Sequence, residues 1–392
     1  MNFNNVDALL ITNPTNIRYL TGFVGAAPEA REAYCLIAQE SIYLFTNALY
    51  LESTKNLESK VPNLKQTPIQ VIKISNEEPF SKKLRQTLTG LNPVNRLGFE
   101  ESNVTVAEYE KLKKELPGIT LVPTQNRIEE LRMIKRADEI ENIRAAAKIT
   151  DECFDYILEK IKPASRRQGS ASRGGIGVTE SELAWKIESF IKTRGAQLAF
   201  SPIVAFGPHT SQPHYSPSHA QGQALRLRVP NIILLDFGAK VNGYCSDMTR
   251  TVFVGKPEAE WVKAYKTVLL AQSAALEYLA SRPGLEATGG KADCTARDVI
   301  EKAGFPTYPH SLGHGVGLDI HEAPRLRSNP STSSITTPTT SPLENLSAGM
   351  VVTVEPGIYI EGQYGIRIED LILLKKDGIE LLSQSPKQLT II

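Results

Sequence analysis

The stretch Asn231–Phe253, NIILLDFGAKVNGYCSDMTRTVF, decides how this chain is interpreted. An apolar run ends in Asp236, and Asn242-Gly243 then favours the positive φ angles of a two-residue hairpin turn. With this turn, position 236 faces position 249, so Asp247 lies on the same face as Asp236 and diagonal to it. Diagonal side chains of a hairpin are within reach, with Cα atoms roughly 7–8 Å apart. Two carboxylates this close repel unless a cation or a proton lies between them. The stretch indicates a metal site; the alternative is an ordinary hairpin whose Asp residues cap turns.

A second hairpin of the same design lies at Met350–Leu373. One strand ends in Glu355 and the returning strand carries Glu369. A three-residue turn centred on Gly362 places these two acids opposite each other. Because Pro356 cannot donate a ladder hydrogen bond, we expect a β-bulge beside it. The C-terminal region thus repeats one arrangement of strand, acid, turn, strand and acid.

Histidines lie between and before the two hairpins. The Gly-rich segment Pro309–Glu322, PHSLGHGVGLDIHE, contains His310, His314 and His321, and His214 precedes the first hairpin. A lone histidine usually has a structural role. Several in one short segment between two acid pairs indicate a functional one.

The charge of the acids predicts the number of metal ions. Four ionised carboxylates carry a charge of about −4, which two divalent cations balance. Oxygen-rich ligation with one imidazole suits manganese, cobalt or iron, and zinc is also compatible. A two-metal site generates a nucleophilic hydroxide and stabilises a tetrahedral transition state. The residues therefore predict a two-metal hydrolase.

Length and composition exclude several other classes. The chain has 392 residues and a net charge of +1, which gives no electrostatic case for nucleic acid or an acidic membrane surface. No apolar run approaches the ~20 residues of a membrane span. The N-terminus lacks the pattern of a signal peptide, and the four cysteines form no CxxC pair. We expect a reduced, cytoplasmic setting.

The sequence predicts an α/β (α+β) protein of two domains, residues 1–125 and 126–392. The first domain alternates short strands and helices and has no histidine, so we expect it to shape or cover a site. A charged helical region, Arg127–Glu159, begins the second. Two segments, 164–177 and Ser328–Pro342, are rich in Gly, Ser, Thr or Arg and read as loops that bury no core.

The whole chain resembles the metallopeptidases of the pita-bread fold, specifically the proline-directed branch of aminopeptidase P and prolidase. The motifs that carry the resemblance are PHY, DFGAKVNGYCSDMTR, HSLGHGVGLDIHE, TVEPGIY and GIRIED, with TGFVGA and LFTNALY in the N-terminal part. The resemblance implies a small N-terminal α/β domain and a catalytic domain with a curved antiparallel sheet. It also implies a homodimer that acts on proline-containing peptides.

The resemblance further implies roles for the acids. Asp236 would bind the first metal, while His314 and Glu355 bind the second. Asp247 and Glu369 would bridge both ions. Glu355 would also accept a proton from the attacking water.

The outer residues of the site follow from the same motifs. His214 and His321 resemble histidines that contact the substrate and stabilise the tetrahedral intermediate. Arg367 resembles an arginine that orients these groups, and His310 matches a further pocket histidine. Arg325 and Arg327 lie where prolidases hold a substrate carboxylate, a task that suits a guanidinium; the alternative for both is a solvated loop arginine. The insertions, and Asn47–Tyr50 in place of Asp-Gly-Arg-Tyr or similar, depart from the family pattern.

The function we expect is that of a metal-dependent exopeptidase that cleaves the Xaa-Pro bond, at the N-terminus of peptides or in dipeptides. One alternative is another hydrolase of this fold, such as a methionine aminopeptidase, which shares the metal ligands but usually lacks the N-terminal domain. Another is a non-catalytic peptide-binding relative, which tends to lose ligands. All five ligands are present here, and this also argues against a creatine-type amidinohydrolase.

Overall fold

The computed structural model describes residues 5–25, 31–38, 41–55, 57, 69–91, 93–162, 175–216, 225–281, 287–328 and 346–392. The chain divides into two compact units, Met1–Arg132 and Met133–Ile392. Most of the two loop segments expected at 164–177 and 328–342 lies outside the described residues. No helix among the described residues is both long and apolar enough to cross a membrane.

The first unit is built on a six-stranded sheet with the order β4-β3-β2-β1-β5-β6. β2 pairs antiparallel with β1 and β3, whereas β3–β4, β1–β5 and β5–β6 are parallel. β1 to β3 are almost entirely apolar, as strands buried on both faces must be. The elements are β1 (Ala8–Ile11), α1 (Pro14–Thr21), β2 (Ala33–Ala38), β3 (Ser41–Thr46), η1 (Ala48–Tyr50), β4 (Ile69–Lys73), α2 (Phe80–Thr89), β5 (Arg96–Glu100), α3 (Val106–Glu115), β6 (Thr120–Thr124) and α4 (Arg127–Met133).

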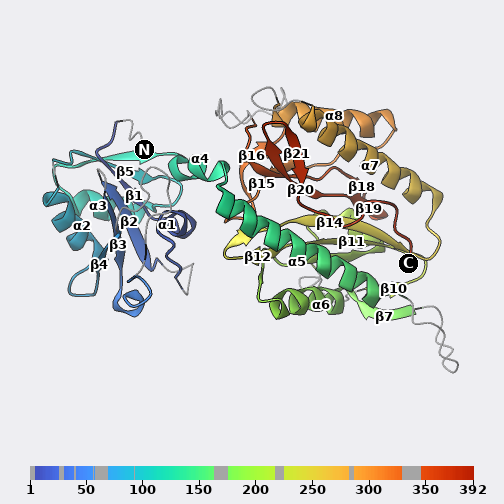
Figure 1. Ribbon diagram of the computed structural model, residues 1–392, viewed down its shortest axis with the longest axis horizontal. Helices are drawn as coiled ribbons and strands as arrows, with labels where there is room; N and C mark the ends of the chain where they lie inside the picture. Colours follow the sequence, from blue (N-terminus) through green and yellow to red (C-terminus); the bar gives the residue numbers. More distant parts are fainter. Residues whose placement is uncertain are drawn as a thin grey trace. The chain divides into compact units, whose positions relative to one another are not determined.

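The described residues of the second unit form antiparallel sheets flanked by four helices (Figure 1). Its elements are α5 (Ala137–Ile161), β7 (Gly175–Thr179), α6 (Glu180–Thr193), β8 (Gln197–Leu198), β9 (Ile203–Phe206), η3 (Gly207–Ser211), β10 (Arg226–Arg228), β11 (Asn231–Phe237), β12 (Ala239–Val241), β13 (Tyr244–Cys245), β14 (Met248–Val254), α7 (Ala259–Ala280), α8 (Gly289–Lys302), β15 (Gly313–Gly315), β16 (Glu322–Leu326), β17 (Val351–Val354), β18 (Gly357–Ile360), β19 (Tyr364–Arg367), β20 (Asp370–Lys375) and β21 (Gly378–Leu381). The expected α/β class with antiparallel sheets in the second part is confirmed.

Two of the apolar clusters among the described residues hold helices α5, α6, α7 and α8 to the strands. In one, α5 and α6 pack on β11 through residues such as Phe154, Leu183 and Ile233. In the other, α7 and α8 pack on the C-terminal strands through residues such as Val268 and Val352. Side chains alternate along β11, so Ile233 and Leu235 face α5 and α6 while Asp236 points away from that cluster. The strand therefore delivers its carboxylate to the space between the two helical layers.

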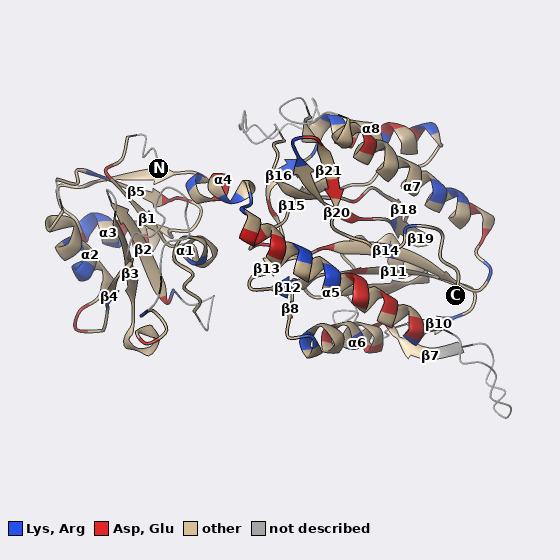
Figure 2. Ribbon diagram, in the orientation of Figure 1, with Lys and Arg blue, Asp and Glu red and all other residues tan. Residues whose placement is uncertain are grey.

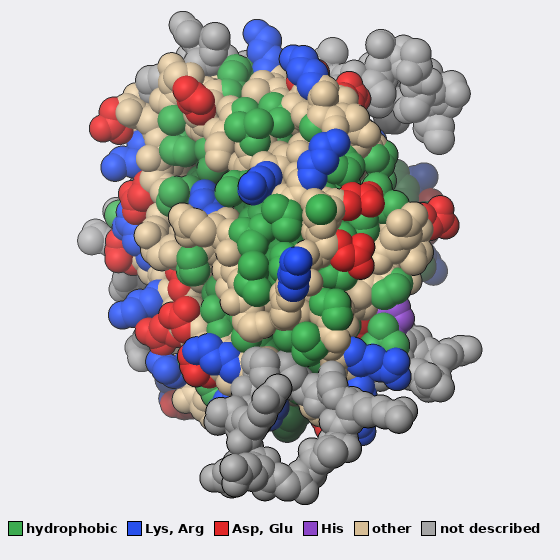
Figure 3. All heavy atoms as spheres, turned by 90° about the vertical axis from the view of Figure 1, so that its right-hand side faces the viewer, with side chains coloured by type: hydrophobic (Ala, Val, Ile, Leu, Met, Phe, Trp, Pro, Cys, Tyr) green, Lys and Arg blue, Asp and Glu red, His purple; other side chains and the backbone are tan. Residues whose placement is uncertain are grey.

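Surface charge is mixed in sign. Figure 2 shows acidic and basic residues interspersed along α5, as the sequence pattern predicts for a solvated helix face. On the described part of the face in Figure 3, Lys, Arg, Asp and Glu lie scattered among apolar side chains. These surfaces therefore show no broad field of one sign.

Candidate metal centre

The first hairpin has the predicted register. Asp236 of β11 pairs with Thr249 of β14, and the turn residues Asn242 and Gly243 have φ angles of 49° and 89°. Both values lie in the left-handed region that a two-residue turn of this type requires. Asp247, one residue before β14, therefore lies diagonal to Asp236.

The second hairpin also has the predicted register, without the expected bulge. Gly357 pairs with Arg367 and Val354 with Asp370, so Glu355 and Glu369 lie opposite each other. The bulge predicted beside Pro356 is wrong, because the ladder is interrupted at the proline but resumes beyond it in the same register. The physical reason is that the side chain of Gln272, on α7, supplies the hydrogen-bond donor that the proline lacks.

Both hairpins open into one cavity of about 250 Å³. Every predicted site residue except Arg327 lines it: Asp236, Asp247, His314, Glu355, Glu369, His214, His310, His321, Arg367 and Arg325. Sequence reasoning missed its apolar wall, formed by Phe200, Ile203 and Ile320. Phe200 and Ile203 precede the first hairpin outside any motif, and Ile320 is an apolar residue within the motif that contains His314 and His321.

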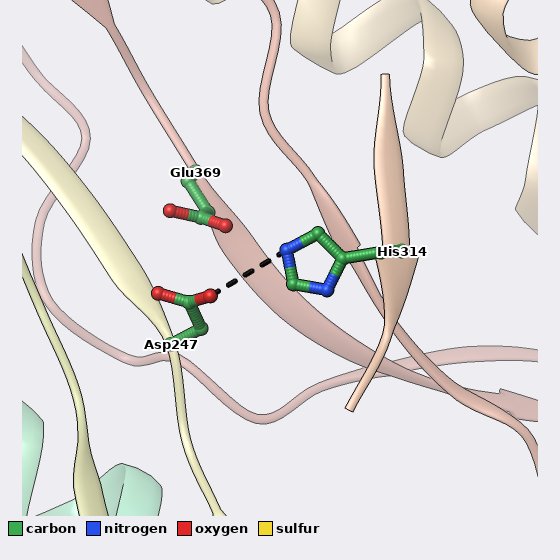
Figure 4. Close-up of side chains that lie close together, drawn as sticks. All are labelled: Asp247, His314 and Glu369. Carbon is green, nitrogen blue, oxygen red and sulfur yellow. Dashed lines mark ion pairs between the residues drawn. The ribbon is translucent and has the colours of Figure 1, made fainter. Parts of the chain in front are cut away.

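Three of the predicted ligands form the tightest group (Figure 4). Asp247, His314 and Glu369 each offer a ligand atom, and these atoms lie within 4.8 Å of one another. His314 donates from Nδ1 to the Gly315 carbonyl over 3.1 Å, because a carbonyl can only accept. Its Nε2 therefore carries a lone pair. This nitrogen lies 3.6 Å from Asp247 Oδ2 and 3.4 Å from Glu355 Oε1. This is the tautomer that metal binding requires.

Burial leaves the acids short of partners. The Asp236 and Asp247 side chains each bury one oxygen, Oδ1, that has no hydrogen-bond partner among the described residues. Burial, together with the neighbouring carboxylates, raises the pKa of Asp247 and Glu355 well above their ordinary values. The same causes raise the pKa of Glu369 to about 7. Unpaired oxygens and mutual repulsion in a closed space fit divalent cations.

One buried cation of the protein partly offsets these charges. The Arg367 guanidinium donates from Nη2 to Asp236 Oδ2 over 2.5 Å and from Nε to Thr249 Oγ1 over 2.9 Å. Thr249 in turn donates to Glu369 Oε2 over 2.7 Å. Thr249 was not predicted as a site residue, although its place opposite Asp236 is a signal in the sequence. The Arg367–Thr249 chain links acids from both hairpins.

The histidines around the acids differ in how their rings are held by the protein. His310 donates from Nδ1 to the Ser311 carbonyl, and its Nε2 accepts from the Tyr359 hydroxyl over 3.0 Å. Both nitrogens are thus engaged within the protein, and burial lowers the His310 pKa to about 4. His321 packs edge-on against His314 with ring centroids 4.4 Å apart, and the exposed His214 lies in the cavity wall.

The two candidate carboxylate-binding arginines differ in their position relative to the cavity. Arg325 lies on β16 directly opposite His314 of β15 and lines the cavity. Its charge contributes to lowering the His321 pKa, after the larger effect of burial. Arg327 follows the end of β16 and is not among the lining residues.

Comparisons with known proteins agree with this geometry. The model of metallopeptidase family M24 matches residues 141–376, and that of the creatinase/prolidase N-terminal domain matches residues 1–134. An uncharacterized peptidase of Bacillus subtilis is 34% identical, covering 99% of this chain and 96% of the relative. An Xaa-Pro dipeptidase from Bacillus anthracis has a TM-score of 0.82 at 32% identity, covering 99% and 95%. An X-Pro aminopeptidase from Thermotoga maritima has a TM-score of 0.79 at 29% identity, covering 99% and 98%.

Proposed function

The chain belongs to metallopeptidase family M24, and from this premise we propose that it hydrolyses Xaa-Pro bonds, with Xaa-Pro dipeptides as its preferred substrates. One observation carries the proposal. The acids of two hairpins and the free Nε2 of His314 converge on one cavity, whose rim also holds Arg325. The names of the similar solved structures support the proline-directed specificity.

The residues that would hold two divalent cations, with manganese the first to test, are Asp236, Asp247, His314, Glu355 and Glu369. Such cations supply a nucleophilic water at neutral pH and polarise the scissile carbonyl. The donor set fits them, since oxygens without partners and a neutral imidazole face the same volume.

The chain's own residues then move the proton. The Glu355 side chain is 15% exposed, compared with 6% for Asp247, so it is accessible from the cavity. It accepts a proton from the attacking water and returns it to the proline nitrogen, which must be protonated to leave. His214 and His321 lie on the cavity wall, where an N–H donor stabilises the oxyanion of the tetrahedral intermediate. Arg367, held by Thr249 and Tyr359, keeps Asp236 in place.

Arg325 supports the choice of dipeptides. A guanidinium binds a carboxylate with two parallel hydrogen bonds, and a dipeptide places its carboxylate one residue from the scissile bond. A free carboxylate at that position is absent from a longer peptide. Arg325 therefore favours Ala-Pro over Ala-Pro-Ala.

The test is a mass-spectrometric assay of protein loaded with Mn²⁺, with bound metal confirmed, offered Ala-Pro, Ala-Pro-Ala and Met-Ala-Ala. Cleavage of Ala-Pro alone supports the proposal. Release of alanine from Ala-Pro-Ala at an equal rate would refute the dipeptide preference but keep the Xaa-Pro specificity. Cleavage of Met-Ala-Ala alone would make the protein a methionine aminopeptidase. Absence of bound metal and of any cleavage would favour a peptide-binding relative.

The remaining parts of the proposal concern the whole protein. From the resemblance of its motifs we further propose a cytoplasmic homodimer with a domain boundary near residue 125. Solution mass measured by light scattering tests the dimer. A monomer of full activity would refute it.

A further inference from the structure

A hydrogen-bond donor is missing at the point where the second hairpin carries its two acids. Glu355 N donates to the Leu312 carbonyl over 2.8 Å, so this residue directs its backbone toward β15. Backbone groups alternate sides along a strand, so position 356 directs its backbone to the opposite strand, where Ile368 lies. Proline has no N–H. The Ile368 carbonyl therefore lacks the donor that any other residue at position 356 would supply.

A side chain from helix α7 supplies that donor. Gln272, which is fully buried, donates from Nε2 to the Ile368 carbonyl over 3.2 Å and to the Val354 carbonyl over 3.1 Å. Both acceptors are carbonyls, so the atom between them is the amide nitrogen. The single carboxamide thus spans the two strands at the level of the proline, and it explains why the register continues without a bulge.

The positions of the two acceptors connect this bond pair to the site. Val354 immediately precedes Glu355, and Ile368 immediately precedes Glu369. We propose that Gln272 is a positioning residue that sets the separation of these two glutamates, and with it the affinity for metal; this rests on the proposed function. The strands pair on both sides of the proline, at Val354–Asp370 and at Gly357–Arg367. Without the carboxamide they lose the bridge between these two pairs, and the two glutamates gain freedom to move apart.

Packing alone does not explain why a polar side chain, that of Gln272, stands at this position. Its neighbours on the buried face of α7 are apolar, among them Val268, Ala271 and Ala275. Its own Oε1 is buried without a partner among the described residues. A buried polar atom left unpaired destabilises the folded state. An apolar side chain of similar size would avoid that cost, so the amide has its value in the two bonds it donates.

The test compares Mn²⁺ affinity, measured by titration calorimetry on metal-stripped protein, in the wild type and three variants. Gln272→Leu removes both bonds, and we expect its dissociation constant for Mn²⁺ to rise about 10–100-fold, as loss of groups that orient ligands does. Gln272→Asn, shorter by one methylene group, tests the same bonds with a smaller change in polarity. Leu279→Ala, two helical turns along the same buried face, is the control: it lowers the melting temperature but leaves Mn²⁺ affinity unchanged.

Restoring the missing amide provides the sharpest check. Pro356→Ala returns an N–H to the position opposite Ile368, so the double variant Gln272→Leu/Pro356→Ala should recover part of the lost affinity. With Ala-Pro as substrate, Gln272→Leu should lower kcat and leave KM near the wild-type value. Mn²⁺ affinities within twofold of wild type for both Gln272 variants would overturn the inference and leave the proposed function intact. A wild-type protein that binds no Mn²⁺ would overturn both.

Discussion

Replacing Glu369 with Gln should change stability and metal binding in opposite directions. Glu369 is 2% exposed and lies among other buried acids, with its pKa raised from 4.5 to about 7, first by burial and then by Asp236. In the metal-free protein its charge is therefore unfavourable above neutral pH. Gln keeps the shape of the side chain and still accepts a hydrogen bond from Thr249, but it carries no charge.

The size of the effect follows from the pKa. A carboxyl group whose pKa rises from 4.5 to about 7 on folding destabilises the folded state by about 3 kcal/mol at pH 8. A raised pKa in the folded state gives stability that is present below pH 4.5 and is lost as the pH rises through 7. Metal-free Glu369→Gln should thus equal wild type near pH 5 and melt higher at pH 8. For a unit of this size, each kcal/mol corresponds to about 2–4 °C.

Calorimetry of metal-stripped protein at pH 5 and pH 8, followed by the same scans with Mn²⁺, is the assay. Wild type should gain stability from Mn²⁺ at pH 8, whereas Glu369→Gln should gain little. Glu361→Gln, on the exposed turn of the same hairpin, changes the same charge and should match wild type throughout. A metal-free Glu369→Gln protein that melts below wild type at pH 8 would refute the reasoning, because repulsion among the acids would then not limit stability.

Three further groups, which react, bind the substrate or position the site, are tested by substitution. Glu355→Gln should lower kcat for Ala-Pro about 10²–10⁴-fold at confirmed metal content; a loss below tenfold would exclude Glu355 as the proton carrier. Arg325→Met should raise KM for Ala-Pro about 10–100-fold, as loss of a charged hydrogen bond does, but should leave KM for the C-terminal amide of Ala-Pro unchanged. Arg327→Met should change neither KM. Equal effects of the two substitutions would contradict the assignment of Arg325 to the substrate carboxylate. The buried Glu180 carboxylate accepts four hydrogen bonds around the segment that leads to His214. Glu180→Gln should therefore lower the melting temperature by several degrees and reduce kcat/KM. Unchanged kinetics would show that Glu180 does not position the site.

The hairpin registers could be predicted because local sequence determines them. Asn242-Gly243 adopts positive φ angles at both positions, and the two-residue period of a strand then places Asp236 opposite Thr249. Gly362 likewise adopts a positive φ angle, of 67°, at the centre of the second turn. In both hairpins a few residues fix which side chains share a face.

The rest of the site depends on contacts that local sequence does not encode. The bulge at Pro356 was predicted from a missing donor, and the prediction failed because Gln272, on a helix distant in sequence, supplies one. Arg325 and Arg327 have the same parity along the chain, so alternation does not separate them. Only the end of β16 at Leu326 places the first against His314 and the second beyond the ladder.

The hydrogen bonds around the acids explain how the site is oriented for a cation. The protein holds one oxygen of three acids: Arg367 holds Asp236 Oδ2, Thr249 holds Glu369 Oε2, and Thr353 holds Glu355 Oε1. These bonds fix orientation, yet the raised pKa of Glu369 and Glu355 indicates that they do not offset burial and repulsion. A site whose ligands are already oriented loses little conformational entropy when a cation binds. Because the free energy stored in repulsion among the acids is released by the same cation, affinity for metal and instability without it arise from one arrangement of side chains.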